Sequence, residues 1–506
     1  MRTAALRSLL ACTLACAVAG PAAAGSFMDT TVTGYLGDDN LLVGPEDFSP
    51  SPGLSNAYPE LFFEGLEAEK TVAVTETHLV LYKRMPGFIR GIETEAALVL
   101  EFEVYRDPDN GEVGPSLSKV DAAIRDDGSY LKLTGYFDRD AMTGPSLSFT
   151  MFPFDSQRFL LGFSYDLTWG GERMYPTNFG PVPGAKLNLD LGPAYFFAGF
   201  KTQPRIQQYY DNQVETQYGV LWGGGLRAGP FFFDANGGFF DRGHFDIQQH
   251  LESTIFALGG SAQLGVHFGD EIGQSVDFRL YRNDPDARDN ASVQMDYTDG
   301  VHFKAASEFT AVGQTAIDFD EPTSTVNSWA TAGDVNLKLR INKLRVHGDV
   351  VYRSVNFLVF NTPGLTPYYS VSEALVTQPQ FYGAVGVDYF FDKPHLTPGV
   401  IFGMMQPAAV QGDEGLAGAF DGTVVVRDAN DLEFLPPGEG PFTIISVKGN
   451  LRWDVSRMLS VMTELSYTVD FNQSKTVGED AGNQVRVLDE DRARQLGFNL
   501  LMQAHF

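Results

Sequence analysis

The last twelve residues of the chain, Gln495 to Phe506, alternate between apolar and mostly polar side chains. Every second residue counted from the end is apolar: Phe506, Ala504, Met502, Leu500, Phe498 and Leu496. A period of two over about one membrane-crossing length predicts a β-strand with one apolar face. The same pattern fits a half-buried strand of a soluble β-sandwich, so the rest of the chain has to decide between the two.

The alternation recurs along the chain and is clearest in its second half. One predicted strand places Leu459, Val461, Leu465, Tyr467, Val469 and Phe471 on one face, with Ser460, Glu464, Ser466, Thr468 and Asp470 on the other. Residues 334–353 predict a hairpin of the same kind, with its turn at Asn342. In a sandwich the charged face would meet bulk water, whereas in a barrel it would line the lumen.

The lengths of the connections favour the barrel, because short links alternate with mostly longer polar ones. The short links are Pro86–Gly91, Arg125–Ser129, Pro153–Gln157, Gly192–Pro193, Ala228–Pro230, Gly269–Gly273, Thr298–Gly300, Ile341–Lys343, Phe391–His395 and Asp454–Arg457. The longer ones include Asp38–Val72, Gly170–Val182, Asn356–Gln378, Gln406–Gly440 and Asn472–Arg492. Outer-membrane barrels sort their connections in this way, with short periplasmic turns and long extracellular loops.

A final strand that ends on an aromatic residue, Phe506, resembles those of the Gram-negative outer-membrane β-barrel (porin-like) superfamily. In that superfamily the last strand carries the signal that the barrel-assembly machinery reads, which gives Phe506 this expected role. The resemblance implies an all-β fold: a single transmembrane antiparallel up-and-down β-barrel in the cell outer membrane, with both termini periplasmic.

Counting the predicted strands from Asp29–Leu36 to Phe506 gives about 22, an even number as expected for such barrels. The segments Ser116–Ile124 and Ala291–Thr298 are short and weakly patterned, so about 18 to 20 strands is the alternative. Natural barrels of 22 strands carry a plug. At that count, the long loops or a partner chain would have to occupy the lumen.

The first residues, Met1 to Ala24, have the order of a secretory signal peptide: Arg2 and Arg7, an apolar run and a small-residue end. We expect residues 25–506 to form the barrel. Both cysteines, Cys12 and Cys16, lie in the leader, and without its two arginines the chain holds 64 acidic and 34 basic residues, a formal charge of −30. This excess argues against nucleic acid as a partner.

Glu93, Glu95, Glu101 and Glu103 alternate with mainly apolar residues, so they should share the lumen-facing side of one strand. They could form a cation-favouring stripe. Alternatively, inward Arg279, Arg345, Arg452 and Lys448 from other strands could partly neutralise a solvated polar face. Glu464 also lies on a predicted inward face, where its replacement should change ion selectivity.

Two kinds of long loop are of interest. Residues Asn356–Gln378 contain Phe357, Phe360, Tyr368 and Tyr369, which predict either a constriction folded into the lumen or an outward contact patch. Loops Asp38–Val72 and Gln406–Gly440 are acidic and could bridge to lipopolysaccharide through divalent ions. Calcium is the candidate cation for loose clusters such as Asp107, Asp109 and Glu112, or Asp284, Asp286 and Asp289, although neither has the spacing of a calcium loop.

We find no catalytic motif: no G-x-S-x-G elbow, no H-E-x-x-H and no P-loop. The sequence therefore predicts no enzyme and no resident cofactor. The first functional hypothesis is a porin-like channel for passive passage of small, neutral or cationic solutes. The second is a structural or export component of an envelope-spanning complex, such as a motility or adhesion assembly or a polysaccharide secretion pore. The expected partners are outer-membrane lipid, lipopolysaccharide, the assembly machinery and, for the second hypothesis, other envelope proteins.

Overall fold

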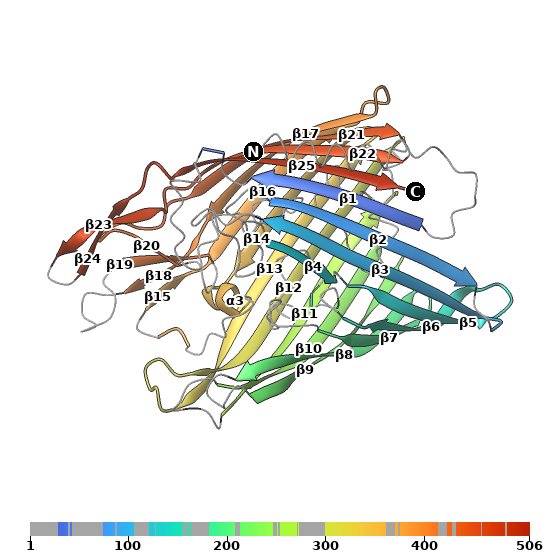
Figure 1. Ribbon diagram of the computed structural model, residues 1–506, viewed down its shortest axis with the longest axis horizontal. Helices are drawn as coiled ribbons and strands as arrows, with labels where there is room; N and C mark the ends of the chain where they lie inside the picture. Colours follow the sequence, from blue (N-terminus) through green and yellow to red (C-terminus); the bar gives the residue numbers. More distant parts are fainter. Residues whose placement is uncertain are drawn as a thin grey trace.

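The first and last strands of the chain pair with each other and close the sheet into a barrel (Figure 1). In this computed structural model, strand β1 (Asp29–Asp38) lies antiparallel between β2 (Val74–Pro86) and β25 (Arg494–His505). At the closure, Phe506 N donates to Thr30 O (2.8 Å) and Thr30 N donates to Phe506 O (3.1 Å). Among the described strands, every barrel strand except β4, which pairs only with β3, has a neighbour on each side, so the sheet closes on itself.

The structure describes most of the strand-forming chain. The described residues are 29–38, 41–42, 74–86, 89–105, 121–126, 128–154, 159, 161–162, 182–207, 213–245, 250, 253–270, 272, 299–360, 370–372, 375–412, 422–427, 432–456, 458–480 and 483–506. The predicted signal peptide, most of loop Asp38–Val72 and both clusters of aspartates lie outside these residues. No helix in the described part is long and apolar enough to cross a membrane.

The remaining barrel strands follow one another around the ring in chain order. They are β3 (Ile92–Tyr105), β4 (Asp121–Asp126), β5 (Tyr130–Asp138), β6 (Thr143–Phe152), β7 (Gly184–Asp190), β8 (Ala194–Gln207), β9 (Gln213–Ala228), β10 (Phe231–His244), β11 (Thr254–Phe268), β12 (Val301–Ile317), β13 (Thr325–Ile341), β14 (Leu344–Arg353), β16 (Gln380–Tyr389), β17 (Leu396–Gln406), β21 (Ile444–Ser456) and β22 (Leu459–Val469). All pairings are antiparallel, as in an up-and-down barrel.

The barrel has 18 strand positions, so the count of about 22 is wrong and the lower end of the alternative range is correct. The sheet contains 19 strands, but β4 and β5 both pair with β3 and share one position. Link Arg125–Ser129 therefore interrupts a strand instead of turning between two.

Three other predicted links are also not turns between barrel strands. Link Pro153–Gln157 opens the single connection, residues 153–183, between the paired strands β6 and β7. Links Gly269–Gly273 and Thr298–Gly300 both belong to the connection between β11 and β12, which pair directly. No further barrel strand therefore lies between the members of either pair. The predicted segment Ala291–Thr298 falls outside the described residues.

Loop length is sorted by end only in part. Six of the predicted short links join neighbouring strands at the end of the barrel where β25 finishes, which we call the short-turn end. A further short turn at this end, residues 139–142, was not predicted. All five predicted long connections lie at the opposite end, the long-loop end. The connection at residues 269–300 is long but belongs to the short-turn end, and the connections at residues 208–212 and 318–324 are short but belong to the long-loop end.

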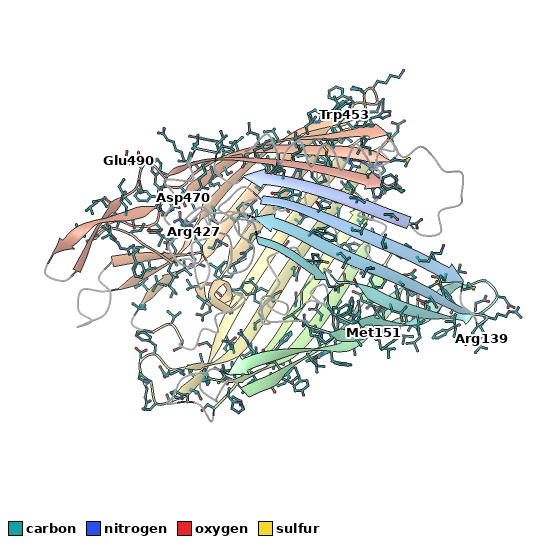
Figure 2. The ribbon with its side chains drawn as sticks, viewed as in Figure 1. Arg139, Met151, Arg427, Trp453, Asp470 and Glu490 are labelled. Carbon is teal, nitrogen blue, oxygen red and sulfur yellow. The ribbon has the colours of Figure 1, made fainter. Side chains whose placement is uncertain are left out.

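Side chains on the outer face are apolar and exposed. Leu465 of β22 is 52 % exposed, Trp329 of β13 60 % and Trp453 of β21 44 %; Figure 2 shows Trp453 and Met151 on the outside of the barrel. Leaving such a surface in water would be unfavourable. The inner face is polar and more buried: Asn499 and Gln495 of β25 lie inside, while Phe498 and Leu500 face outward.

The long-loop end carries additional structure beyond the barrel (Figure 1). A four-stranded sheet is formed by β15 (Val376–Gln378), β18 (Ala408–Gly412), β19 (Gly422–Val426) and β20 (Leu432–Phe434), and β23 (Ser474–Asp480) and β24 (Asn483–Leu488) form a hairpin. The short helix α3 (Val355–Phe360) follows β14.

Candidate functional site

The inner wall of the barrel is the candidate site, and its charged side chains are paired locally. Arg84 of β2 contacts two of the predicted glutamates on β3: its Nε lies 2.7 Å from Glu93 Oε1 and 3.7 Å from Glu95 Oε1. Both glutamates are on the inward face, with Ala97 and Val99 as the apolar interruption. Arg84 was not among the predicted neutralising residues. The Glu93–Glu95 part of the stripe is therefore balanced by the adjacent strand instead of standing alone.

The predicted inward bases are paired in the same way. Arg345 of β14 is fully buried, with Nε and Nη2 each 2.7 Å from Asp388 Oδ2 on β16. Lys448 of β21 lies 2.9 Å from Glu464 Oε1 on β22, and Arg452 Nε donates to Asp454 Oδ1 (2.9 Å). Each of these three basic side chains has a counter-charge on its own or the next strand. Their positive charge therefore does not by itself decide whether anions or cations pass more readily.

A hydrogen-bonded network extends from the Lys448–Glu464 pair across the barrel closure. Asn499 Nδ2 of β25 donates to Glu464 Oε1 (3.2 Å), and Tyr35 Oη of β1 donates to Asn499 Oδ1 (2.7 Å). Four consecutive strands are thus tied together on the inside. Glu464 therefore has a structural role that alternation alone did not predict.

One segment of the β6–β7 connection lies inside the barrel. Phe159 and Leu161 are buried and belong to an apolar cluster with inward residues of β2, β3, β5, β6 and β9 to β12: Val80, Tyr82, Val99, Tyr130, Phe152, Leu221, Phe240, Ala257 and Val312. These strands lie on facing parts of the ring, so the cluster reaches across the lumen. We call Phe159, Leu161 and Gly162 the lumen segment.

The lumen segment is held by a side chain of β10. Asn236 Oδ1 accepts from Gly162 N (3.2 Å), and Asn236 Nδ2 donates to Gly162 O (3.3 Å). The amide thereby mimics a strand neighbour for Gly162. The sequence interpretation missed this segment because it assigned Pro153–Gln157 to a turn and Gly170–Val182 to an outer loop. The apolar residues Phe159 and Leu161 after Pro153 were the available signal.

The predicted aromatic loop contributes one residue to the barrel interior. Phe357 of α3 packs against Ala330 and Ala332, which face inward from β13, while Val355 and Leu358 pack against Ala408 and Val426 of the four-stranded sheet. Helix α3 thus joins the inner wall to the structure at the long-loop end. The side chain of Phe360 and residues Tyr368 and Tyr369 lie outside the described part.

A buried ion pair links two of the long connections at that end (Figure 2). Arg427 Nη2 lies 2.7 Å from Asp470 Oδ2, just beyond the end of β22, and donates to Asn472 O (3.1 Å). Asn472 in turn accepts from Phe442 N (2.6 Å) through Oδ1. Burial raises the pKa of the Asp470 carboxyl to about 6, while hydrogen bonds from Asn472 and Gln473 act in the opposite direction. These contacts hold the four-stranded sheet beside β22.

The remaining candidates are placed only in part. Glu101 and Glu103 belong to β3 and follow the inward register of Glu93, but their side chains, and residue Arg279, lie outside the described part. Phe506 sits at the short-turn end next to Thr30. Among the described side chains, no group of three or more His, Cys, Asp or Glu could hold a metal ion.

These features define a class of protein: a closed β-barrel of the outer-membrane type, with an apolar exterior and a polar, partly occupied interior. No protein-family model matches the chain, and no curated protein matches it.

Solved structures with a similar fold include three barrels of Pseudomonas aeruginosa. OccK1 (OpdK) is 9 % identical with a TM-score of 0.42, over 95 % of this chain and 98 % of that one. OpdL is 9 % identical with a TM-score of 0.43, and OccK5 (OpdH) 8 % with 0.44, each over 95 % of this chain and 97 % of the other.

Proposed function

We propose that this protein is a porin-like channel of the outer membrane that lets small polar solutes pass through its lumen. The observation that carries the proposal is the polar inner wall inside a closed 18-position barrel, because barrels of about 16 to 18 strands leave an aqueous channel. We further propose that both termini face the periplasm, since the short-turn end is periplasmic in this architecture. Lipopolysaccharide and the assembly machinery remain proposed partners, and loop-bound calcium a proposed ligand.

Purified full-length protein should conduct ions across a planar lipid bilayer. Reconstituted barrel is expected to give stepwise currents because, apart from the apolar cluster around Phe159 and Leu161, its inner wall is mainly polar. A folded sample is recognised by its anomalous gel migration before boiling. Folded protein that gives no current at any voltage would refute the channel.

Asn236→Ala should raise single-channel conductance. The substitution removes both side-chain bonds to Gly162, worth about 1 kcal/mol each, so the lumen segment is held less tightly. Ser261→Ala is a matched control, because Ser261 is another inward polar residue on the neighbouring strand β11 that bonds Glu308 instead of the segment. Equal conductance in wild type and Asn236→Ala would show that the lumen segment does not limit flow.

One observation supports the second candidate function, that of a scaffold or export component. The apolar cluster around Phe159 and Leu161 crosses the lumen, and a barrel sealed at this level would act as an anchor for its loops. Absence of current from folded protein, together with copurification of other envelope proteins, would favour this function over the channel.

A further inference from the structure

Four aromatic rings lie against the inner wall between the lumen segment and the short-turn end. Each ring occupies the space above a glycine, where a Cβ atom would come within 3 Å of it. The pairs of ring and glycine are Phe159 over Gly199, Phe197 over Gly223, Tyr195 over Gly225 and Phe232 over Gly265. A side chain at any of these glycines would push the ring off the wall. We call the four rings the ring tract.

The ring tract is continuous along the wall. The ring centroids of Phe159 and Phe197 are 6.0 Å apart, and those of Phe197 and Tyr195 are 6.5 Å apart with an interplanar angle of 12°. The guanidinium of Arg227 then lies between Tyr195 and Phe232, with Cζ 5.9 Å and 5.3 Å from their centroids. A solute that moves along this wall would therefore pass from one flat apolar face to the next.

Polar side chains flank the two rings of β8. The register across β7 to β10 aligns two rows, which are Asn188, Phe197, Gly223 and Asn236, and Asp190, Tyr195, Gly225 and Asp234. The two rings, and the polar residues Asn188 and Asp190 beside them, are only partly buried on the inward face. Each ring thus has an amide or a carboxyl group on either side of it, and one face of the row is open to the lumen.

The charge in the middle of the ring tract is balanced. Arg227 Nη1 lies 2.8 Å from Asp234 Oδ1, and Tyr195 Oη donates to the same oxygen (2.8 Å). The pair of Arg227 and Asp234 is neutral as a whole, so it does not favour an ion of either sign. Lys186 and Lys304 lie at the two ends, with Nζ 5.0 Å from the Phe197 centroid and 5.7 Å from the Phe232 centroid.

A pyranose sugar matches this combination of flat rings and polar rows. The faces of the sugar carry C–H groups that pack on an aromatic ring, and the hydroxyl groups at its rim both donate and accept hydrogen bonds. Asn188 offers donors and an acceptor at the edge of Phe197, and Asp190 offers acceptors at the edge of Tyr195. Small-molecule sites typically combine aromatic surface with a few placed polar groups in this way.

We propose that the ring tract, with the polar side chains of its two rows, binds a neutral saccharide on its way through the lumen. The proposal rests on the channel function and gives its substrate class. A neutral saccharide falls within the neutral or cationic solutes expected from the sequence, but the support comes from the rings and their glycines instead of the glutamates of β3.

The test is block of the ion current through the full-length barrel in a planar bilayer by cellotriose, a neutral trisaccharide. Cellotriose should reduce the wild-type current in proportion to its binding. Tyr195→Leu should raise the half-blocking concentration roughly fivefold, because the ring is lost while an apolar side chain remains. Tyr195→Phe keeps the ring and should block like wild type. Phe196→Leu is the matched control, because Phe196 lies between the two rings on β8 but faces outward, 54 % exposed, and should leave the half-blocking concentration unchanged.

The outcomes separate this proposal from the channel function. A current that cellotriose does not reduce, or equal half-blocking concentrations in wild type and Tyr195→Leu, would overturn the saccharide site and leave the channel intact. Block by neutral benzamide without block by cellotriose would assign the rings to aromatic solutes and overturn the saccharide site as well. Folded barrel without current would refute the channel. Calorimetric titration of that folded protein with cellotriose in detergent then decides the site, and equal heats for wild type and Tyr195→Leu would overturn it.

Discussion

Leu465→Arg is expected to destabilise the inserted barrel by about 2–4 kcal/mol if the residue lies near the bilayer midplane. Leu465 is on the outer face of β22 and lies inside the segment Leu459–Val469 that pairs with β25, so its side chain would meet lipid. An arginine there would have to leave water without a counter-charge. Denaturant unfolding of the reconstituted protein, followed by the gel shift on boiling, measures the difference.

Leu465→Ala is the matched control, because it removes the same side chain without adding charge and should cost less than the arginine. Equal stability of the arginine variant and wild type would show that this face does not contact lipid. The inward neighbour Glu464 is not a neutral control, since it is paired with Lys448 and bonded by Asn499.

Arg345→Met should destabilise the barrel by about 3–5 kcal/mol, the usual cost of removing one partner of a buried ion pair. Arg345 is fully buried and Asp388 is 3 % exposed, so the remaining carboxylate would be left in the wall without its cation.

The double variant Arg345→Met/Asp388→Leu should recover much of this loss, because replacing both partners by apolar groups leaves no uncompensated charge. Denaturant unfolding of all four proteins gives the coupling free energy. Additive losses would mean that the two side chains are not coupled across β14 and β16.

Alternation predicted the faces of the strands because side chains in a strand point to opposite sides whatever its neighbours are. It placed Phe498 outside and Asn499 inside, and it put Glu93 and Glu95 on the inner wall. It could not give the strand count. An extended segment such as Asp121–Asp126 has the same local pattern whether it forms a strand position of its own in the barrel or shares one position with β5. Pairing between strands, and not periodicity, decides that.

The candidate site was harder to predict for the same reason. Glu93 and Arg84 meet through the register of β2 and β3, and Asn236 meets Gly162 although they are 74 residues apart. The rings on the wall depend on glycines of other strands, such as Gly265 on β11 beneath Phe232. None of these contacts can be predicted from the spacing of residues along one strand.

The pairing of β1 with β25 covers two backbone edges that are exposed until the barrel closes. Thr31 meets His505, so the two strands that close the barrel are more than 450 residues apart in the sequence. Throughout translation and export the amino-terminal strand has an unsatisfied backbone edge that invites association with other chains. Pairing of β1 with β25 therefore removes the two backbone edges at which unclosed chains could associate.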